Sequence, residues 1–273
     1  MFFVMAETTG PAAPGQPRPL IVTVYGLYGR DDDGWLSVAL LVRLLAELGI
    51  EEPAVRSAIS RLKRRGLLIP ARHGGAAGYA LSAEAREILA EGDEHIFTPP
   101  AATVADGWLL AVFSVPESER ARRHTLRSRL AALGFGTAAP GVWVAPAHRY
   151  PLTKLILHRH GLESYVDLFR ADYLAFTDLV RAVTKWWDLE QLEKSYVDFL
   201  ATWSSPPAAN PFATWVRALT DWRRLPYLDP GLPAELLPAD WPGTRAAALV
   251  GDLRARLSGP AAAYVQDTAA RVR

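Results

Sequence analysis

Residues 51–66, EEPAVRSAISRLKRRG, place basic and hydroxyl side chains at helical spacing beside an apolar stripe. Val55, Ile59 and Leu62 recur at the period of a helix, so a helix here turns all three to one side. The polar side chains between them face away from that stripe. Guanidinium groups bind guanine through paired hydrogen bonds, and serine hydroxyls bind bases or phosphate oxygens. The residues that could do this chemistry in a DNA major groove are Arg56, Ser57, Ser60, Arg61, Lys63 and Arg64.

A charged helix face is often only a solvated surface, and this alternative explains part of the pattern. The basic residues 63–65 suit the negative carboxyl end of the helix dipole. The helix dipole does not explain Arg56 and Arg61. Arg56 lies near the helix start, where the dipole disfavours a cation. The segment from Glu52 to His73 contains six Lys and Arg side chains and one carboxylate. Its local net charge is therefore +5, in a chain whose total net charge is +1. We therefore predict that this helix binds DNA.

Two helices joined by a tight turn must position this basic face. Ser37 is a favourable N-cap for a helix that begins at Val38, and Gly49 stops that helix. Pro53 lies where a first-turn proline is tolerated, and Gly66 closes the basic helix. This order is that of a helix-turn-helix motif.

A β-hairpin is predicted to follow the basic helix. Two strand-like segments, LLIPA and GYALS, flank a glycine-rich tip. A hairpin after a helix-turn-helix makes a winged helix-turn-helix domain, which we place at residues 19–98. Arg72 and His73 near the tip would contact the adjacent DNA backbone or minor groove. The apolar segment 20–29 is either a helix or a strand, because its length does not distinguish the two.

The middle of the chain alternates strand-like and helix-like segments. Strands are expected at 107–115, 141–146 and 163–171, and helices at 117–133 and 152–160. Such alternation indicates a small α/β sandwich, and we expect a ferredoxin-like domain over residues 103–172.

Strand patterns disappear after residue 172, and we expect an all-helical carboxy-terminal domain at 173–273. Two final helices are expected at 244–257 and 260–272. Six of the nine tryptophans lie between Trp186 and Trp241. These aromatic side chains form a core, line a pocket for a flat apolar acyl group, or do both.

Length and composition limit the remaining possibilities. A chain of 273 residues suggests two or three domains. It has no cysteine, which excludes disulfides and thiolate metal sites. Residues 1–18 suggest a disordered tail without the features of a signal peptide, and no apolar run is long enough for a membrane span. We expect a cytoplasmic protein without a metal or cofactor.

Several ordered motifs resemble the phenylacetate-catabolism repressor family (PaaX type). The segments PRPLIVTVYGLYGR, GWLSVALLVRLLAELG, EEPAVRSAISRLKRRGLL and GYALSAEAREIL are similar to its amino-terminal domain. The resemblance continues through WLLAVFSVPESERARRHTLRSRLAALGFG, GVWVAP and LPAELLPADWPG, so it covers nearly the whole chain. It implies a cytoplasmic bacterial repressor with winged-helix, ferredoxin-like and helical domains and an effector of the phenylacetyl-CoA kind. By motif position, the recognition-helix face falls on Arg56, Ser57, Ser60 and Arg61.

The middle domain also resembles the ferredoxin-like nucleases of CRISPR adaptation, which makes catalysis an alternative. Those proteins carry a metal-binding aspartate at the end of their first strand. Here that strand ends at Phe113-Ser114-Val115-Pro116, and no carboxylate appears until Glu117. Because metal-dependent hydrolysis needs hard oxygen ligands, the sequence argues against a nuclease.

We therefore predict an α+β multidomain protein that is not an enzyme. Its expected function is a ligand-responsive transcriptional repressor that binds double-stranded operator DNA as a homodimer and is released by an aromatic acyl-CoA. Two alternatives stay open: a nucleic-acid-processing enzyme that uses the middle domain, and an assembly protein whose wing binds another protein.

Overall fold

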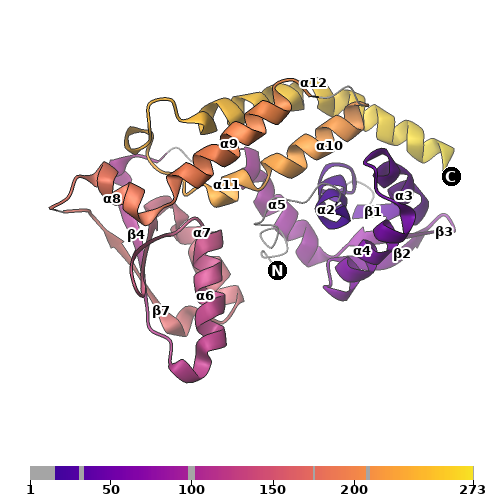
Figure 1. Ribbon diagram of the computed structural model, residues 1–273. Helices are drawn as coiled ribbons and strands as arrows, with labels where there is room; N and C mark the ends of the chain where they lie inside the picture. Colours follow the sequence, from indigo (N-terminus) through magenta and orange to yellow (C-terminus); the bar gives the residue numbers. More distant parts are fainter. Residues whose placement is uncertain (1–15, 31–33, 98–101, 175, 207–209, 273) are drawn as a thin grey trace. The chain divides into compact units, whose positions relative to one another are not determined.

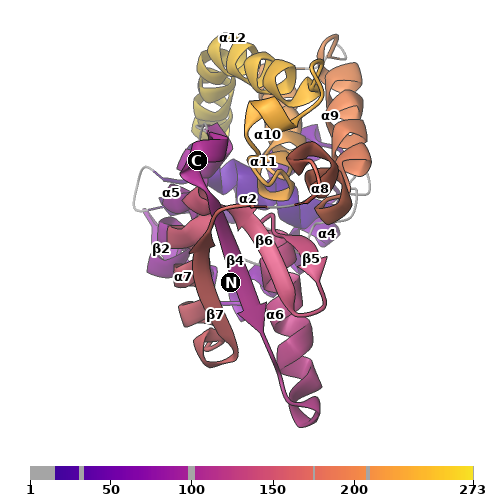
Figure 2. The same ribbon diagram turned by 90° about the vertical axis from the view of Figure 1, so that its left-hand side faces the viewer.

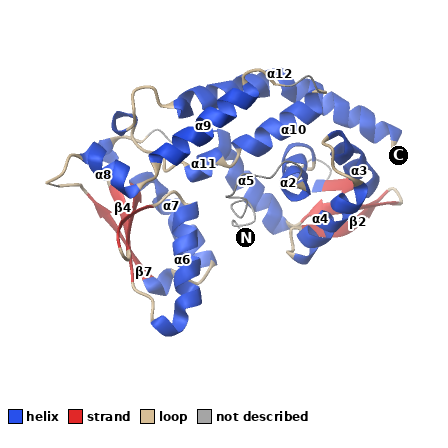
Figure 3. Cartoon of the chain, in the orientation of Figure 1, coloured by secondary structure: helices blue, strands red, loops and turns tan. Residues whose placement is uncertain are grey.

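The computed structural model describes residues 16–30, 34–97, 102–174, 176–206 and 210–272. Two antiparallel sheets and many helices give a mixed α+β chain, as predicted at that level (Figures 1 and 3). The chain forms two compact units, each built from separate stretches of sequence. Of the described residues, unit 1 holds 102–198 and 224–245, and unit 2 holds the rest.

The amino-terminal part of unit 2 runs helix, strand, two helices, hairpin and helix. The segment whose type the sequence left open is a helix, and Pro17 and Arg18, which we had assigned to a disordered tail, open it. A proline fits there because its missing N–H would have no partner in the first turn; the tail up to residue 15 lies outside the described residues. The elements are α2 (Pro17–Tyr28), β1 (Trp35–Ser37), α3 (Val38–Glu47), α4 (Glu52–Arg64), β2 (Leu68–His73), β3 (Ala76–Leu81) and α5 (Ala83–Phe97).

These elements enclose one apolar core and one three-stranded sheet. The Ser37 hydroxyl accepts a hydrogen bond from the Leu40 backbone N–H, which confirms the predicted N-cap of α3. The sheet has the order β1-β3-β2, and both neighbouring pairs are antiparallel. Helices α2, α3 and α4 contribute fully buried side chains to this core: Ile21, Val24, Leu41, Leu44, Leu45, Val55 and Ala58.

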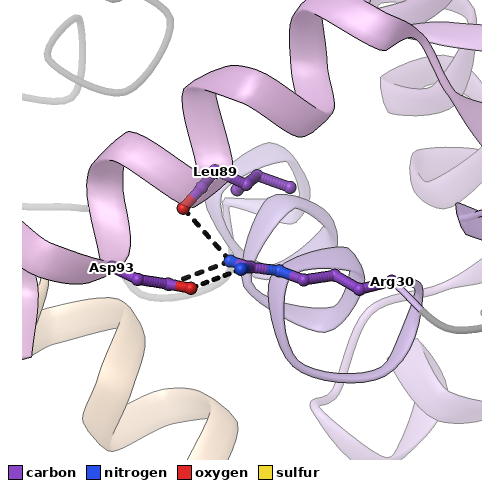
Figure 4. A network of polar contacts seen from close by, with 3 residues as sticks. All are labelled: Arg30, Leu89 and Asp93. Atoms are coloured by element: carbon purple, nitrogen blue, oxygen red, sulfur yellow. Dashed lines mark hydrogen bonds and ion pairs between the residues drawn. The ribbon is translucent and has the colours of Figure 1, made fainter.

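A bidentate ion pair fixes α5 within unit 2 (Figure 4). The guanidinium of Arg30, just past the end of α2, binds both carboxylate oxygens of Asp93. It also donates a 3.2 Å hydrogen bond to the Leu89 carbonyl oxygen one turn earlier. These three contacts hold α5 close to the carboxyl end of α2.

Helix α10 (Pro211–Trp222) belongs to the same core as α2. The hydroxyls of Thr220 and Thr23 are hydrogen-bonded at 2.8 Å, and both residues are buried. The Trp222 indole donates to the Ile96 carbonyl oxygen at the end of α5 (2.9 Å). Residues of the expected carboxy-terminal domain thus contribute to both compact units. The linear division into three domains stays a prediction.

Unit 1 contains a four-stranded sheet with helices α6 and α7 on one face (Figure 2). The strand order is β5-β6-β4-β7, and every neighbouring pair is antiparallel. The sequence analysis missed β5, because Gly136–Ala139 falls in a glycine-rich stretch without strand periodicity. The elements are β4 (Trp108–Phe113), α6 (Arg120–Ala132), β5 (Gly136–Ala139), β6 (Val142–Pro146), α7 (Tyr150–Arg159) and β7 (Val166–Ala171).

The carboxy-terminal helices differ from the prediction at one point. The two helices expected after residue 242 are one helix, α12 (Pro242–Arg271), with Pro260 inside it. A proline removes one backbone donor, and here the helix continues across that gap. The other elements are α8 (Leu179–Trp186), α9 (Leu189–Trp203) and α11 (Leu225–Leu228).

A buried arginine attaches the proline-rich loop after α11 to the sheet of unit 1. Arg149 is 4% exposed, and its guanidinium donates to the carbonyl oxygens of Asp229 (2.5 Å) and Pro230 (3.2 Å). Burial lowers the pKa of Arg149, and the charge of Asp229 acts in the opposite direction. The Asp229 carboxylate accepts hydrogen bonds from the Tyr196 hydroxyl and the Gly231 N–H, both at 2.7 Å. The loop is therefore held by charge-assisted hydrogen bonds.

We expect Arg149→Met to lower the free energy of unfolding by about 2–4 kcal/mol, because it leaves two buried carbonyl oxygens without their donor. Urea denaturation of the full chain measures this. The exposed Arg181→Met on α8 is the matched control and should change stability by less than about 0.5 kcal/mol. Equal stability of the two variants would contradict the anchoring role.

Candidate nucleic-acid interface

Helix α4 has the start, the end and the buried stripe that its sequence predicts. Pro53 lies in its first turn, and the buried residues include Val55, Ile59 and Leu62. This stripe packs on α2 and α3. The helix ends at Arg64, and Gly66 follows the C-cap with a φ of +71°, a left-handed conformation that glycine adopts without strain. The opposite side of α4 is left to solvent.

The structure places every predicted site residue at the surface. Six lie on or at the end of the solvent side of α4, and two lie in strand β2 of the hairpin. They are Arg56, Ser57, Ser60, Arg61, Lys63, Arg64, Arg72 and His73, and all are exposed. Cations and hydroxyls are therefore available to a ligand on both elements.

Arg56 has a local partner that the sequence argument did not weigh. Its Nε is 2.7 Å from Glu52 Oε1, and a terminal guanidinium nitrogen is 2.6 Å from the same oxygen. An exposed pair at i and i+4 contributes about 0.3–0.5 kcal/mol to helix stability, and Glu52 suits the positive amino end of the helix. The inference that Arg56 lacks a structural reason for its position was therefore wrong.

Arg61 makes a different contact on the same face. Its guanidinium donates a 3.1 Å hydrogen bond to the Ser57 hydroxyl one turn earlier, and both side chains stay exposed. No carboxylate partner of Arg61 is found among the described residues. Its charge is uncompensated, so Arg61 is the stronger candidate for contacting a base.

Trp35 positions the hairpin, and the sequence analysis missed it. Its ring stacks on the His73 imidazole, with 4.9 Å between ring centroids and 27° between planes. Its indole N–H donates to the Ala71 carbonyl oxygen of β2 (3.3 Å). Gly78 makes room for this ring, since a Cβ there would lie 2.5 Å from Trp35 and from the Leu36 carbonyl oxygen. A glycine inside a strand was the signal that could have revealed this close approach.

The two carboxylates that follow strand β4 both make contacts within the middle segment. The Glu117 carboxylate binds the guanidinium of Arg123 at 2.8 Å, and the Glu119 carboxylate accepts a 2.5 Å hydrogen bond from the Tyr165 hydroxyl. Within the described part of the chain, no group of three or more His, Asp or Glu side chains is placed to hold a metal ion.

Three family models match consecutive parts of the chain. The model described as "PaaX-like protein" matches residues 16–85, "PaaX protein central Cas2-like domain" matches 101–183, and "PaaX-like protein C-terminal domain" matches 187–267. The chain belongs to the PaaX family. The predicted family resemblance is thus confirmed, and the matched residues include α4 and the hairpin.

Two similar proteins support the assignment to the PaaX family. The "Transcriptional repressor PaaX" of Escherichia coli is 28% identical over 277 residues, which cover 94% of this chain and 85% of that protein. An uncharacterized protein of Mycobacterium tuberculosis, Rv0674, has a solved structure with a TM-score of 0.63 and 25% identity. That comparison covers 90% of this chain and 97% of the other.

None of the described helices combines the length and the apolar character that a membrane span requires.

We expect Gly78→Ala to destabilise the chain by about 1–3 kcal/mol, because its Cβ overlaps a backbone oxygen and displaces the Trp35 ring. Hydrogen exchange of the hairpin amides should accelerate at the same time. Gly251→Ala on α12 is the matched control; a Cβ there meets nothing within 4 Å, so the same change should stabilise the helix by about 0.5–1 kcal/mol. Protection of the hairpin in Gly78→Ala at the level of the unchanged chain would show that Trp35 does not position it.

Proposed function

We propose that this PaaX-family chain is a ligand-responsive transcriptional repressor that binds operator DNA. The observation that carries the proposal is the exposed face of α4, where Arg61 and Ser57 are joined by a hydrogen bond and no carboxylate pairs with Arg61 among the described residues. The similar Escherichia coli protein bears the name of a transcriptional repressor, which supports the same function here.

In this proposal, helices α3 and α4 and the β2–β3 hairpin act as a winged helix-turn-helix. Helix α4 enters the major groove, where the Arg61 guanidinium contacts guanine and the serines contact bases or phosphates. The hairpin lies on the adjacent backbone or minor groove with Arg72 and His73. Lys63 and Arg64, at the carboxyl end of α4, bind phosphates.

The middle segment supports a ferredoxin-like domain. Its strand order β5-β6-β4-β7, with a helix after β4 and another after β6, is the order of a split β-α-β fold. The nuclease alternative needs a carboxylate at the end of β4 to bind a metal ion, and Glu117, the first carboxylate there, pairs with Arg123 instead. We assign effector binding and dimerisation to the middle and carboxy-terminal segments, outside the winged helix.

We further propose that the repressor binds as a two-fold homodimer. One α4 helix and one hairpin cover few base pairs, and a symmetric dimer doubles the contacts at matched half-sites. Nuclease footprinting of the unchanged protein on its own promoter region should therefore show two related half-sites.

The proposed effector is an aromatic acyl-CoA, and an aromatic cluster in unit 1 is its candidate region. The Trp186 ring packs edge-on against Trp108 (5.9 Å between centroids) and Tyr173 (5.4 Å). Trp108 is buried, whereas Trp186, Trp187 and Tyr173 are half-buried. The cluster is therefore partly core and partly accessible aromatic surface. This is compatible with both interpretations of the tryptophans, as core residues and as the lining of a pocket for an acyl group.

We expect Arg61→Ala to weaken operator binding by about 1–3 kcal/mol and to relax base preference. Arg56→Ala is expected to do the same, and Glu52→Ala is its control because it removes the ion pair and keeps the cation. Lys63→Ala should weaken all DNA similarly and lower the salt slope by about one. Fluorescence anisotropy on the chain's own promoter region and on unrelated DNA measures these effects. Unchanged operator affinity in Arg56→Ala and Arg61→Ala would show that α4 is not the recognition helix.

We expect phenylacetyl-CoA to weaken operator binding by about 5- to 150-fold, the usual range of allosteric coupling. By thermodynamic linkage, operator DNA must weaken phenylacetyl-CoA binding by the same factor. Calorimetry on the full chain measures both, because a fragment that lacks α2 would expose the buried face of α10. Free coenzyme A is the control for the acyl group. Absence of phenylacetyl-CoA binding, or an operator affinity that phenylacetyl-CoA does not change, would exclude this effector.

A further inference from the structure

A second basic surface lies on helix α6 in unit 1, which carries none of the residues of the candidate interface. The sequence of α6, RARRHTLRSRLAA, has five arginines and one histidine and no carboxylate. Surface helices that only need to be soluble normally mix both signs of charge. The chain as a whole has a net charge of +1, so this concentration of charge is local.

Three of these arginines interact with the rest of the chain, and one of them is the half-buried Arg129. Arg123 is half-buried and donates to the Glu117 carboxylate (2.8 Å) and to the Val115 carbonyl oxygen (2.7 Å). Arg122 reaches the Gly161 carbonyl oxygen at 3.4 Å. Both side chains therefore contribute to the attachment of α6 within unit 1.

Three further side chains have no such structural contact. Arg120, His124 and Arg127 are exposed, and none has a hydrogen bond or ion pair with any described residue. Their spacing of i, i+4 and i+7 puts them on one face over two helical turns, about 10 Å along the axis. This row, which we call the α6 basic row, lies outside the buried stripe that contains Leu126 and Leu130.

The α6 basic row is unfavourable for the helix that carries it. Arg120 is the first residue of α6, where the helix dipole repels a cation, and the first turn contains no acidic residue. Arg127 also lies four residues after Arg123, and cations at i and i+4 repel each other by about 0.2–0.5 kcal/mol per pair. Arg56 on α4 has an ion pair with Glu52. Glu119 at the N-cap of α6 suits the helix dipole, but within the described residues no carboxylate pairs with the α6 basic row. A partner that supplies negative charge would remove this penalty.

We propose that the α6 basic row binds backbone phosphates of double-stranded DNA, as a second contact that does not distinguish sequences. This proposal rests on the proposed function, which supplies a long polyanion as partner. The row lies on the convex outer side of a helix, whereas small ligands such as coenzyme A bind in concave sites. Exposed arginines suit a phosphate backbone, because each bound phosphate releases counterions and adds to affinity without reading bases.

The test compares two charge-removing variants of the full chain on the same DNA. Arg120→Gln/Arg127→Gln removes two cations from the α6 basic row. Arg181→Gln/Lys185→Gln removes two exposed cations from α8 and is the matched control. Anisotropy titrations on operator and unrelated DNA over a range of salt give the affinity and the salt slope, and thermal melting confirms that both variants are folded.

The α6 variant should lower the salt slope by about one for each arginine removed. Its affinity should fall by the same factor on operator and on unrelated DNA, and the α8 control should match the unchanged protein. A salt slope equal to that of the control would overturn the proposal, as would loss of phenylacetyl-CoA binding without loss of DNA binding. Failure of the unchanged protein to bind DNA would instead reject the proposed function itself.

Discussion

The candidate interface depends on the buried polar contact between α10 and α2. The Thr220–Thr23 hydrogen bond lies in the core, and Arg223, just after α10, donates to the Pro19 carbonyl oxygen at 3.3 Å. A buried polar group that loses its partner costs more than the bond contributes when it is made. These contacts therefore fix how α10 lies along α2. Because α2 packs directly against α4, the basic face is supported by a helix that is distant in the sequence.

Arginine has two distinct uses in this chain. Arg149 and Arg223 are buried and donate to backbone carbonyl oxygens, where a planar, weakly hydrated cation can satisfy several acceptors at once. Arg61, Arg120 and Arg127 keep their charge at the surface. The near-neutral total charge conceals this separation, so only the local environment distinguishes a structural arginine from one available to phosphate.

Local features were predictable from the sequence, and contacts between distant segments were not. The stripe of α4, the N-cap of α3 and the stop at Gly66 depend on neighbours within a few residues. The same periodicity correctly put the predicted site residues on the exposed side of α4. The ion pair of Arg56 with Glu52 is also a local feature. The sequence analysis overlooked it because it compared Arg56 only with the helix dipole.

The parts that the sequence did not predict require knowledge of pairing. The stack of Trp35 on His73 joins residues 38 positions apart and depends on the register of β1 with β3. Strand β5 has no apolar alternation and is a strand because β6 pairs with it. No pattern within α10 indicates that its partner is α2, since an apolar stripe does not specify what covers it.

The discontinuity of unit 2 has a consequence for the order in which the protein folds during synthesis. Amino-terminal domains generally fold first as the chain leaves the ribosome. Here α2 remains without its partner until α10 has been made, and the Phe212 ring, which lies beside Tyr28, also stacks on Tyr264 near the end of α12. The segment that carries α4 therefore completes its core only when almost the whole chain has been translated. An incomplete chain would then lack a stable α4 surface, and premature termination would release a protein without a formed candidate interface.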